Sequence, residues 1–165
     1  MENDRILFEY ECTPAWSGGV GSFGGRTLCV NSSGSVTYYE YVHGKPEPTL
    51  TRTFDGGIDL ANTIDSIIEF HKEDIKNIPE NLDNGSLDGC FDNFTFDEKQ
   101  IKALNISQVD VEECKKENPE YYQDYSSNIE HENTVINLYL EIVKAIKFIV
   151  PDIKNSDIWE YWDVA

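Results

Sequence analysis

The period at which apolar residues recur changes along the chain, and this change limits the fold more than any other feature of the sequence. From Ile6 to Cys12, apolar residues and one cysteine occupy every second position, while Glu9 and Glu11 take positions between them. This alternation predicts a half-buried β-strand. From Asp59 onward, apolar residues recur at helical spacing instead. Strands followed by helices predict an α+β domain.

Turn-forming sequences divide the other β-branched and aromatic segments into antiparallel strands. Asn31–Ser35 separates two such segments and predicts a hairpin, and Asp97–Gln100 separates a later pair in the same way. Besides the first strand, the predicted strands are Thr27–Val30, Val36–Val42, Thr49–Phe54, Cys90–Phe96 and Ile101–Ser107. We therefore expect an antiparallel sheet of about six strands.

Two main helices are predicted to pack on this sheet. The first runs from about Asp59 to Ile75, with Asp59 as its N-cap, and Pro151 ends the second. Between the sheet and the second helix, residues 108–132 are acidic and poor in aliphatic side chains, so we expect a loop or a short solvated helix there. The whole chain, residues 1–165, is expected to form one domain. The apolar stripe of the second helix consists of Val135, Ile136, Tyr139, Leu140, Ile142, Val143, Ile146 and Ile149.

The formal charge of the chain is −18, from 31 acidic and 13 basic residues. Asp55–Glu132 holds 20 of the acidic residues and only 6 of the basic ones. Such a surface repels nucleic acid and anionic membranes and attracts basic proteins. A basic protein is therefore the expected partner, although the same charge could serve only to keep the protein soluble.

The start of the chain and its cysteines favour a reducing compartment. Met1–Asp4 are polar or acidic apart from the initial methionine, and no basic segment followed by an apolar run comes after them. We therefore expect no secretion signal and a cytoplasmic protein. The four cysteines contain no Cys-x-x-Cys pair, so we expect them to be reduced and to act as small core residues. They are Cys12, Cys29, Cys90 and Cys114.

Three motifs match a cofactor or metal site only in part. Gly19–Gly24 has the G-x-G-x-x-G pattern, but a predicted strand rather than a helix follows it. Asn84–Gly89 resembles the first half of a calcium loop, but Thr95 stands where such a loop needs a bidentate glutamate. The three histidines, His43, His71 and His131, lack metal-ligand spacing. We expect no cofactor, no bound metal and no catalytic residues.

Aromatic residues in acidic company are the candidate partner-binding residues. An aromatic side chain at the centre of an interface supplies affinity, and surrounding charges supply steering. An alternative is that the two C-terminal tryptophans fold back onto the sheet as core residues. The candidates are Glu112, Glu113, Glu117, Glu120, Tyr121, Tyr122, Asp124, Trp159 and Trp162.

In its acidity, its size, its strands followed by helices and its lack of catalytic motifs, the chain resembles the small immunity proteins of bacterial polymorphic-toxin and contact-dependent growth-inhibition systems. The resemblance is one of overall character and assigns no residue. It implies a cytoplasmic inhibitor that binds one toxin domain, often a basic nuclease, and blocks its active site. Two other hypotheses remain open: a phage-type inhibitor that mimics nucleic acid, and a small metal-dependent enzyme that uses its acidic residues.

Overall fold

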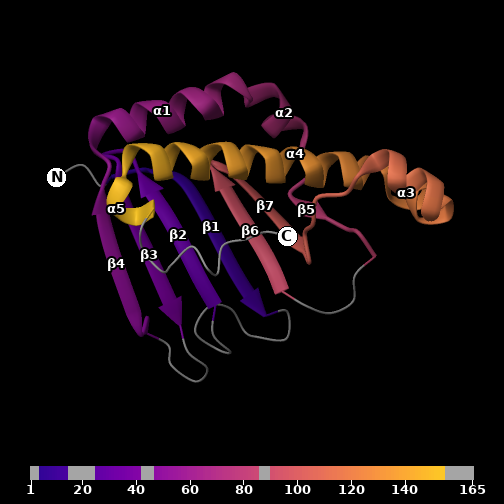
Figure 1. The fold of residues 1–165 in the computed structure, drawn as a ribbon, viewed down its shortest axis with the longest axis horizontal. Coiled ribbons are helices and arrows are strands. Elements are labelled where there is room, and N and C mark those ends of the chain that lie inside the picture. Colours follow the sequence, from indigo (N-terminus) through magenta and orange to yellow (C-terminus); the bar gives the residue numbers. More distant parts are fainter. Residues whose placement is uncertain (1–3, 15–24, 42–46, 86–89, 155–165) are drawn as a thin grey trace.

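The protein folds into two layers, a seven-stranded sheet and a layer of helices (Figure 1). The computed structural model describes residues 4–14, 25–41, 47–85 and 90–154. The strands are β1 (Ile6–Pro14), β2 (Gly25–Asn31), β3 (Ser35–Tyr41), β4 (Leu50–Asp55), β5 (Asn81–Leu82), β6 (Cys90–Phe96) and β7 (Lys99–Leu104). The helices are α1 (Gly57–Phe70), α2 (Lys72–Asn77), α3 (Val111–Glu117), α4 (Pro119–Ile149) and α5 (Pro151–Lys154). The predicted α+β class is confirmed.

The sheet has the order β4-β3-β2-β1-β6-β7-β5, and every adjacent pair is antiparallel except β5 and β7. The six predicted strands are present, and β5 is an additional strand of two residues, too short to show an alternating pattern. In the central strand, Tyr10 lies opposite Leu28 of β2 and Phe94 of β6. Directly opposite residues point to the same face of a sheet. These three side chains are buried together on the face that the helices cover.

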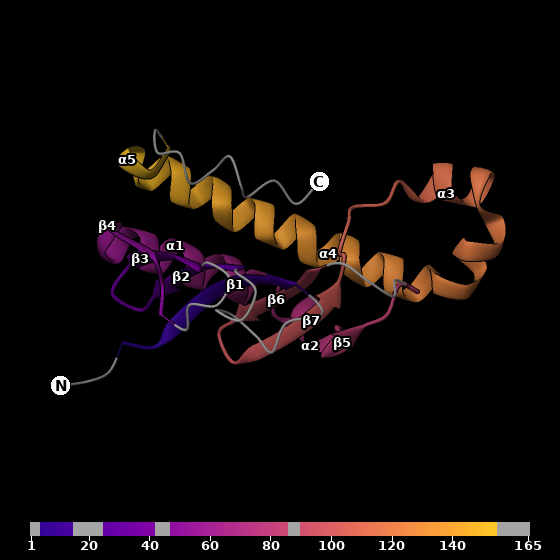
Figure 2. The same ribbon diagram turned by 90° about the horizontal axis from the view of Figure 1, so that it is seen from below.

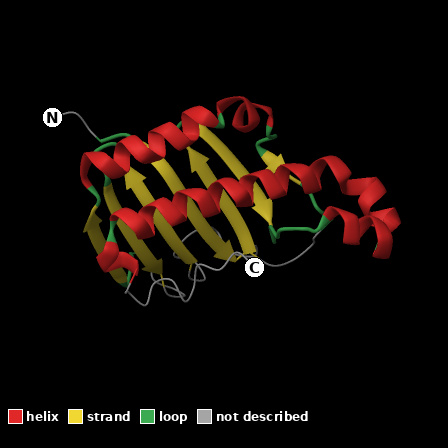
Figure 3. Ribbon diagram, turned by 45° about the horizontal axis from the view of Figure 1, so that its top comes forward, coloured by secondary structure: helices red, strands yellow, loops and turns green. Residues whose placement is uncertain are grey.

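Helices α1 and α4 lie side by side across that face (Figure 3) and run in opposite directions (Figure 1). Tyr139 of α4 lies against Phe8, Tyr10 and Phe94 of the sheet, with ring centroids 5.1–6.2 Å apart. The start of α1 is fixed by the turn between β2 and β3. At Gly34 (φ +85°) a Cβ atom would lie only 1.8 Å from the Gly57 carbonyl oxygen, so this close contact requires glycine.

The first predicted helix is in fact two helices. α1 ends at Phe70 and α2 begins at Lys72, and the imidazole Nε2 of His71 between them lies 2.9 Å from Glu141 Oε2 of α4. Asp59 is not the N-cap, because α1 begins two residues earlier and Asp59 lies in its first turn. The Asp55 carboxylate instead accepts a hydrogen bond from the Gly57 backbone N–H, at 2.9 Å.

Residues 108–132 are mostly helical. This corrects the prediction of a loop or a short solvated helix in this segment. It contains α3 and the first turns of α4, which is 31 residues long and kinked at Tyr125. Ile129 and Glu132 extend the buried face of α4 toward its N-terminus. This continuation was missed because a buried glutamate interrupts the apolar pattern.

The buried stripe of α4 was predicted correctly except at its edges. Leu140 is 46% exposed, whereas Leu138, which was not assigned to the stripe, is 3% exposed. The two residues are about 200° apart around the helix. Leu138 lies on the flank next to His71 and Ile75 and is buried there, whereas Leu140 lies on the other flank. Pro151 does not simply end the helix, because it also begins α5.

All four cysteines are free, and only Cys114 is buried. Cys12, Cys29 and Cys90 are half-buried; Cys12 packs against the core, so the expectation of core cysteines is wrong for Cys29 and Cys90. The three half-buried cysteines lie on three adjacent strands, β1, β2 and β6. Burial raises the pKa of the Cys12 thiol to about 12 and that of Cys29 to about 11, which keeps both thiols protonated at neutral pH.

Candidate functional site

The predicted acidic residues lie on α3 and on the first turns of α4, a region that we call the acidic helical segment (residues 110–124). The Asp110 carboxylate caps α3 by accepting a hydrogen bond from the Glu113 backbone N–H, at 3.0 Å. Glutamates in the first turn and lysines in the last turn suit the dipole of this helix. Pro119 begins α4 at a position where no backbone donor is needed. Local sequence therefore accounts for both helix starts.

The acidic helical segment projects beyond the edge of the sheet (Figures 1 and 2). It holds six acidic residues and two lysines. Within the described residues, one ion pair involves these carboxylates, between Lys115 Nζ and Glu112 Oε1 at 3.5 Å. The five predicted binding carboxylates, Glu112, Glu113, Glu117, Glu120 and Asp124, are all exposed to solvent. They are available to a partner without prior unfolding.

The two predicted tyrosines differ in their surroundings. The Tyr121 hydroxyl donates a hydrogen bond to the Asn84 carbonyl at 2.9 Å, and its ring lies 4.9 Å from that of Tyr125. Tyr121 therefore fastens the acidic helical segment to the loop before β6. The Tyr122 ring is half-buried, with Lys115 Nζ 5.1 Å from its centre. Of the two, Tyr122 is the better placed to contact a partner.

Several predicted features lie wholly or partly outside the described residues. Trp159, Trp162 and the glycine motif Gly19–Gly24 are among them. Of the partial calcium motif, Asn84 and Gly85 are described. The Asn84 amide donates hydrogen bonds to the Leu104 carbonyl and to Glu132, at 2.9 and 3.0 Å. Its side chain is thus engaged in joining the loop to the sheet and to α4.

Two buried carboxyl groups, one on β6 and one on α4, were not predicted. Asp92 on β6 accepts hydrogen bonds from the Tyr10 hydroxyl and from the Ile106 backbone N–H. Glu132 on α4 is 1% exposed and accepts its hydrogen bond from Asn84. Burial raises the pKa of Asp92 above its usual value, and burial together with the nearby Asp92 charge raises that of Glu132 to about 7. Neither carboxyl lines the cavity described next, so both belong to the core.

The face of the sheet opposite α4 carries a second acidic feature. On β1, Glu11 lies between Thr27 of β2 and Asn93 of β6. Glu9 lies one row away, between Cys29 and Thr95. Sequence alternation had already placed these two glutamates opposite the core face, and only the strand order reveals their polar neighbours.

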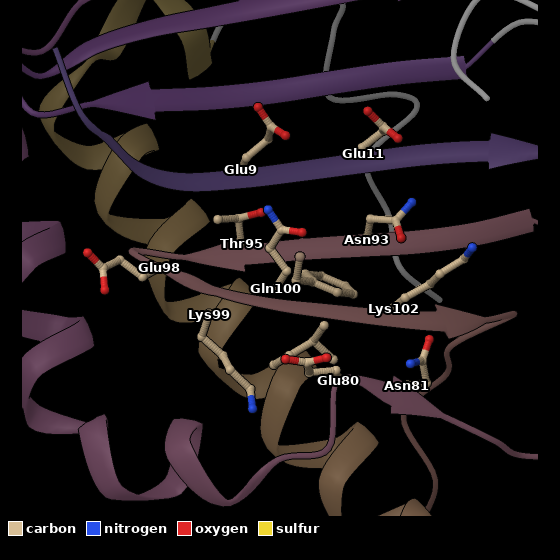
Figure 4. A pocket seen from close by; sticks show the side chains of 12 residues that line it. Glu9, Glu11, Glu80, Asn81, Asn93, Thr95, Glu98, Lys99, Gln100 and Lys102 are labelled. Carbon is tan, nitrogen blue, oxygen red and sulfur yellow. The ribbon is translucent and has the colours of Figure 1, made fainter. Parts of the chain in front are cut away.

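A cavity of about 650 Å³ lies over this face between β1 and β5 (Figure 4). Burial raises the pKa of both glutamate carboxyls, and for Glu11 the nearby charge of Glu9 adds to the effect. The cavity has four carboxylates and two lysines in its lining. These charged residues are Glu9, Glu11, Glu80, Glu98, Lys99 and Lys102.

Two further observations concern the described residues. Within residues 4–14, 25–41, 47–85 and 90–154, no group of three or more His, Cys, Asp or Glu side chains is arranged to hold a metal ion. The helices in this same part of the chain include none that is both long and apolar enough to cross a membrane.

Comparison of the chain with protein-family models, with curated proteins and with solved structures finds no match. The function is therefore inferred from the sites alone.

Proposed function

We propose that the protein is an acidic inhibitor that binds a basic partner, and that it acts as an immunity protein against a cognate bacterial toxin. The observation that carries the proposal is the exposure of five carboxylates on a helical segment that projects beyond the sheet. Exposed charge of one sign steers a partner of opposite charge and sets its orientation.

A toxin with nuclease activity suits this surface. An enzyme that holds nucleic acid presents Lys and Arg side chains to the phosphates. Carboxylates can occupy those positions without being cleaved, so Glu113 and Glu117 would compete with the substrate. Tyr122 of α4, whose ring lies near Lys115 of α3, would supply an aromatic contact within the charged surface.

The test begins with affinity capture of the partner from the native host at low salt, followed by co-expression of the captured protein with this chain. The proposal predicts a basic partner whose toxic activity is neutralised by the wild-type chain. Glu113→Lys/Glu117→Lys should weaken neutralisation. Asp59→Lys/Glu130→Lys makes the same charge change on exposed helical positions outside the acidic helical segment and should have a much smaller effect. An acidic partner, or a partner whose activity is unaffected by the wild-type chain, would contradict the proposal.

A further inference from the structure

The cavity on the face of the sheet opposite α4 has the features of a site for a cationic side chain. Glu9 and Glu11 are two residues apart on β1, so they point to the same face with their Cα atoms about 7 Å apart. Both carboxylates are half-buried. Neither forms an ion pair with any described residue. Cys29 of β2 lies directly opposite Glu9, and its thiol is only a weak donor. These carboxylates retain capacity for a stronger donor.

The residues around the two glutamates add hydrogen-bond acceptors. Asn93 and Thr95 of β6 lie directly opposite Glu11 and Glu9, and Gln100 of β7 lies opposite Thr95. All three line the cavity, and their side chains surround the same space in Figure 4. Each has a side-chain oxygen that can accept a hydrogen bond. The cavity therefore offers acceptors in two neighbouring rows.

The net charge of the cavity favours a cation over an anion. Its lining has four carboxylates against Lys99 and Lys102, and Lys102 Nζ lies 4.0 Å from the centre of the Phe91 ring. Lys102 is thus held over an aromatic ring. Half-buried carboxylates that have no counter-ion among the described residues are disfavoured in their charged form, and a bound cation would favour that form again.

We propose that this cavity is a second contact site for the same basic partner and that it receives an arginine side chain between Glu9 and Glu11. This inference rests on the function proposed above. A guanidinium has five N–H donors in a rigid plane and can serve two carboxylates and neighbouring oxygens together. An ammonium is more compact and more strongly hydrated, so lysine fits this arrangement less well.

The size and position of the cavity agree with this occupant. Its volume of about 650 Å³ exceeds that of one side chain and leaves room for the residues flanking the arginine. Glu80 and Asn81 line it at the β5 side of the sheet, and the acidic helical segment projects at that same side (Figure 1). A partner that lies along the β5 edge would contact both.

The experiment uses the full chain and a synthetic eight-residue peptide of alternating arginine and glycine, with a lysine version for comparison. Titration followed by amide chemical shifts should locate the arginine peptide on β1, β6 and β7. Glu9→Gln/Glu11→Gln should weaken its binding about tenfold. The matched control Asp59→Asn/Glu130→Gln removes the same charge from helices and should weaken binding less than threefold. The lysine peptide should bind several-fold more weakly than the arginine peptide.

Other results would overturn the cavity proposal. These are chemical shifts confined to residues 110–124, equal losses in the two double variants, or no shifts at millimolar peptide. The mapping uses the wild-type chain, so it decides the question even if the glutamine variants fold poorly. The proposed function is judged separately by the partner that the capture experiment identifies, so the two proposals can fail independently.

Discussion

Replacement of Glu132 by glutamine should remove a large part of the pH dependence of folding stability. The carboxyl is 1% exposed, accepts a hydrogen bond from Asn84 and has no ion pair among the described residues. Its pKa is raised from an ordinary value of 4.5 to about 7, chiefly by burial and also by the nearby Asp92 charge. The folded state therefore holds a proton that the unfolded chain releases at lower pH.

The direction and size of the effect follow from this difference. Between pH 4.5 and 7 the folded state binds more protons than the unfolded state, so the free energy of unfolding falls as pH rises. The contribution of Glu132 is fully present below pH 4.5 and is lost above pH 7. Each unit of difference in pKa corresponds to about 1.4 kcal/mol, which gives a loss of about 3 kcal/mol across this window.

The assay is urea denaturation of the wild type and of Glu132→Gln at a series of pH values from 4.5 to 8. The glutamine side chain keeps an acceptor for Asn84 but cannot ionise. The wild type should lose about 3 kcal/mol more stability than the variant across the series. Glu130→Gln, at an exposed position two residues away, should give a curve parallel to that of the wild type. Parallel curves for Glu132→Gln as well would refute an ionisable carboxyl buried at this position.

Four substitutions test other contacts of the fold by chemical denaturation. Leu138→Ala should cost about 2–5 kcal/mol, while Leu140→Ala should cost less than about 1 kcal/mol because its side chain is 46% exposed; equal costs would mean that the assigned flank of α4 is wrong. Tyr121→Phe loses one hydrogen bond to a backbone carbonyl and should cost about 1 kcal/mol, and an unchanged midpoint would argue against that contact. Gly34→Ala combines a positive φ with a backbone overlap and should prevent stable folding, so an alanine variant of wild-type stability would contradict the turn geometry.

Local pattern was sufficient for six of the seven described strands, because each of the six carries its own signal. The alternation in β1 places Tyr10 on the core face and Glu9 on the other, and turn residues separate β2 from β3. The parallel pairing of β5 with β7 could not be predicted, because a two-residue strand has no periodicity and depends on its neighbour. The break at His71 was also missed, since the apolar spacing continues through it.

For the candidate sites too, some features could be predicted from the sequence and others could not. Exposure of Glu113 and Glu117 was predictable from a segment with few aliphatic residues to bury, although its helical structure was not. The contact of Tyr121 with Asn84 joins residues 37 positions apart, and no local pattern encodes it. The polar surroundings of Glu9 depend on the order of the strands, which brings β1 and β6 together although the end of β1 and the start of β6 are separated by 75 residues, 15–89. Such features emerge only from tertiary structure.

The most direct test of the central claim is the rate at which the captured partner associates with the acidic helical segment, measured by stopped-flow mixing over a range of salt concentrations. If exposed carboxylates steer the partner, wild-type association should slow markedly as salt screens them. Glu113→Lys/Glu117→Lys should associate more slowly at low salt and should depend less on salt, whereas Asp59→Lys/Glu130→Lys should remain closer to the wild type. Identical rates and salt dependence for the wild type and Glu113→Lys/Glu117→Lys would contradict a binding surface on residues 110–124.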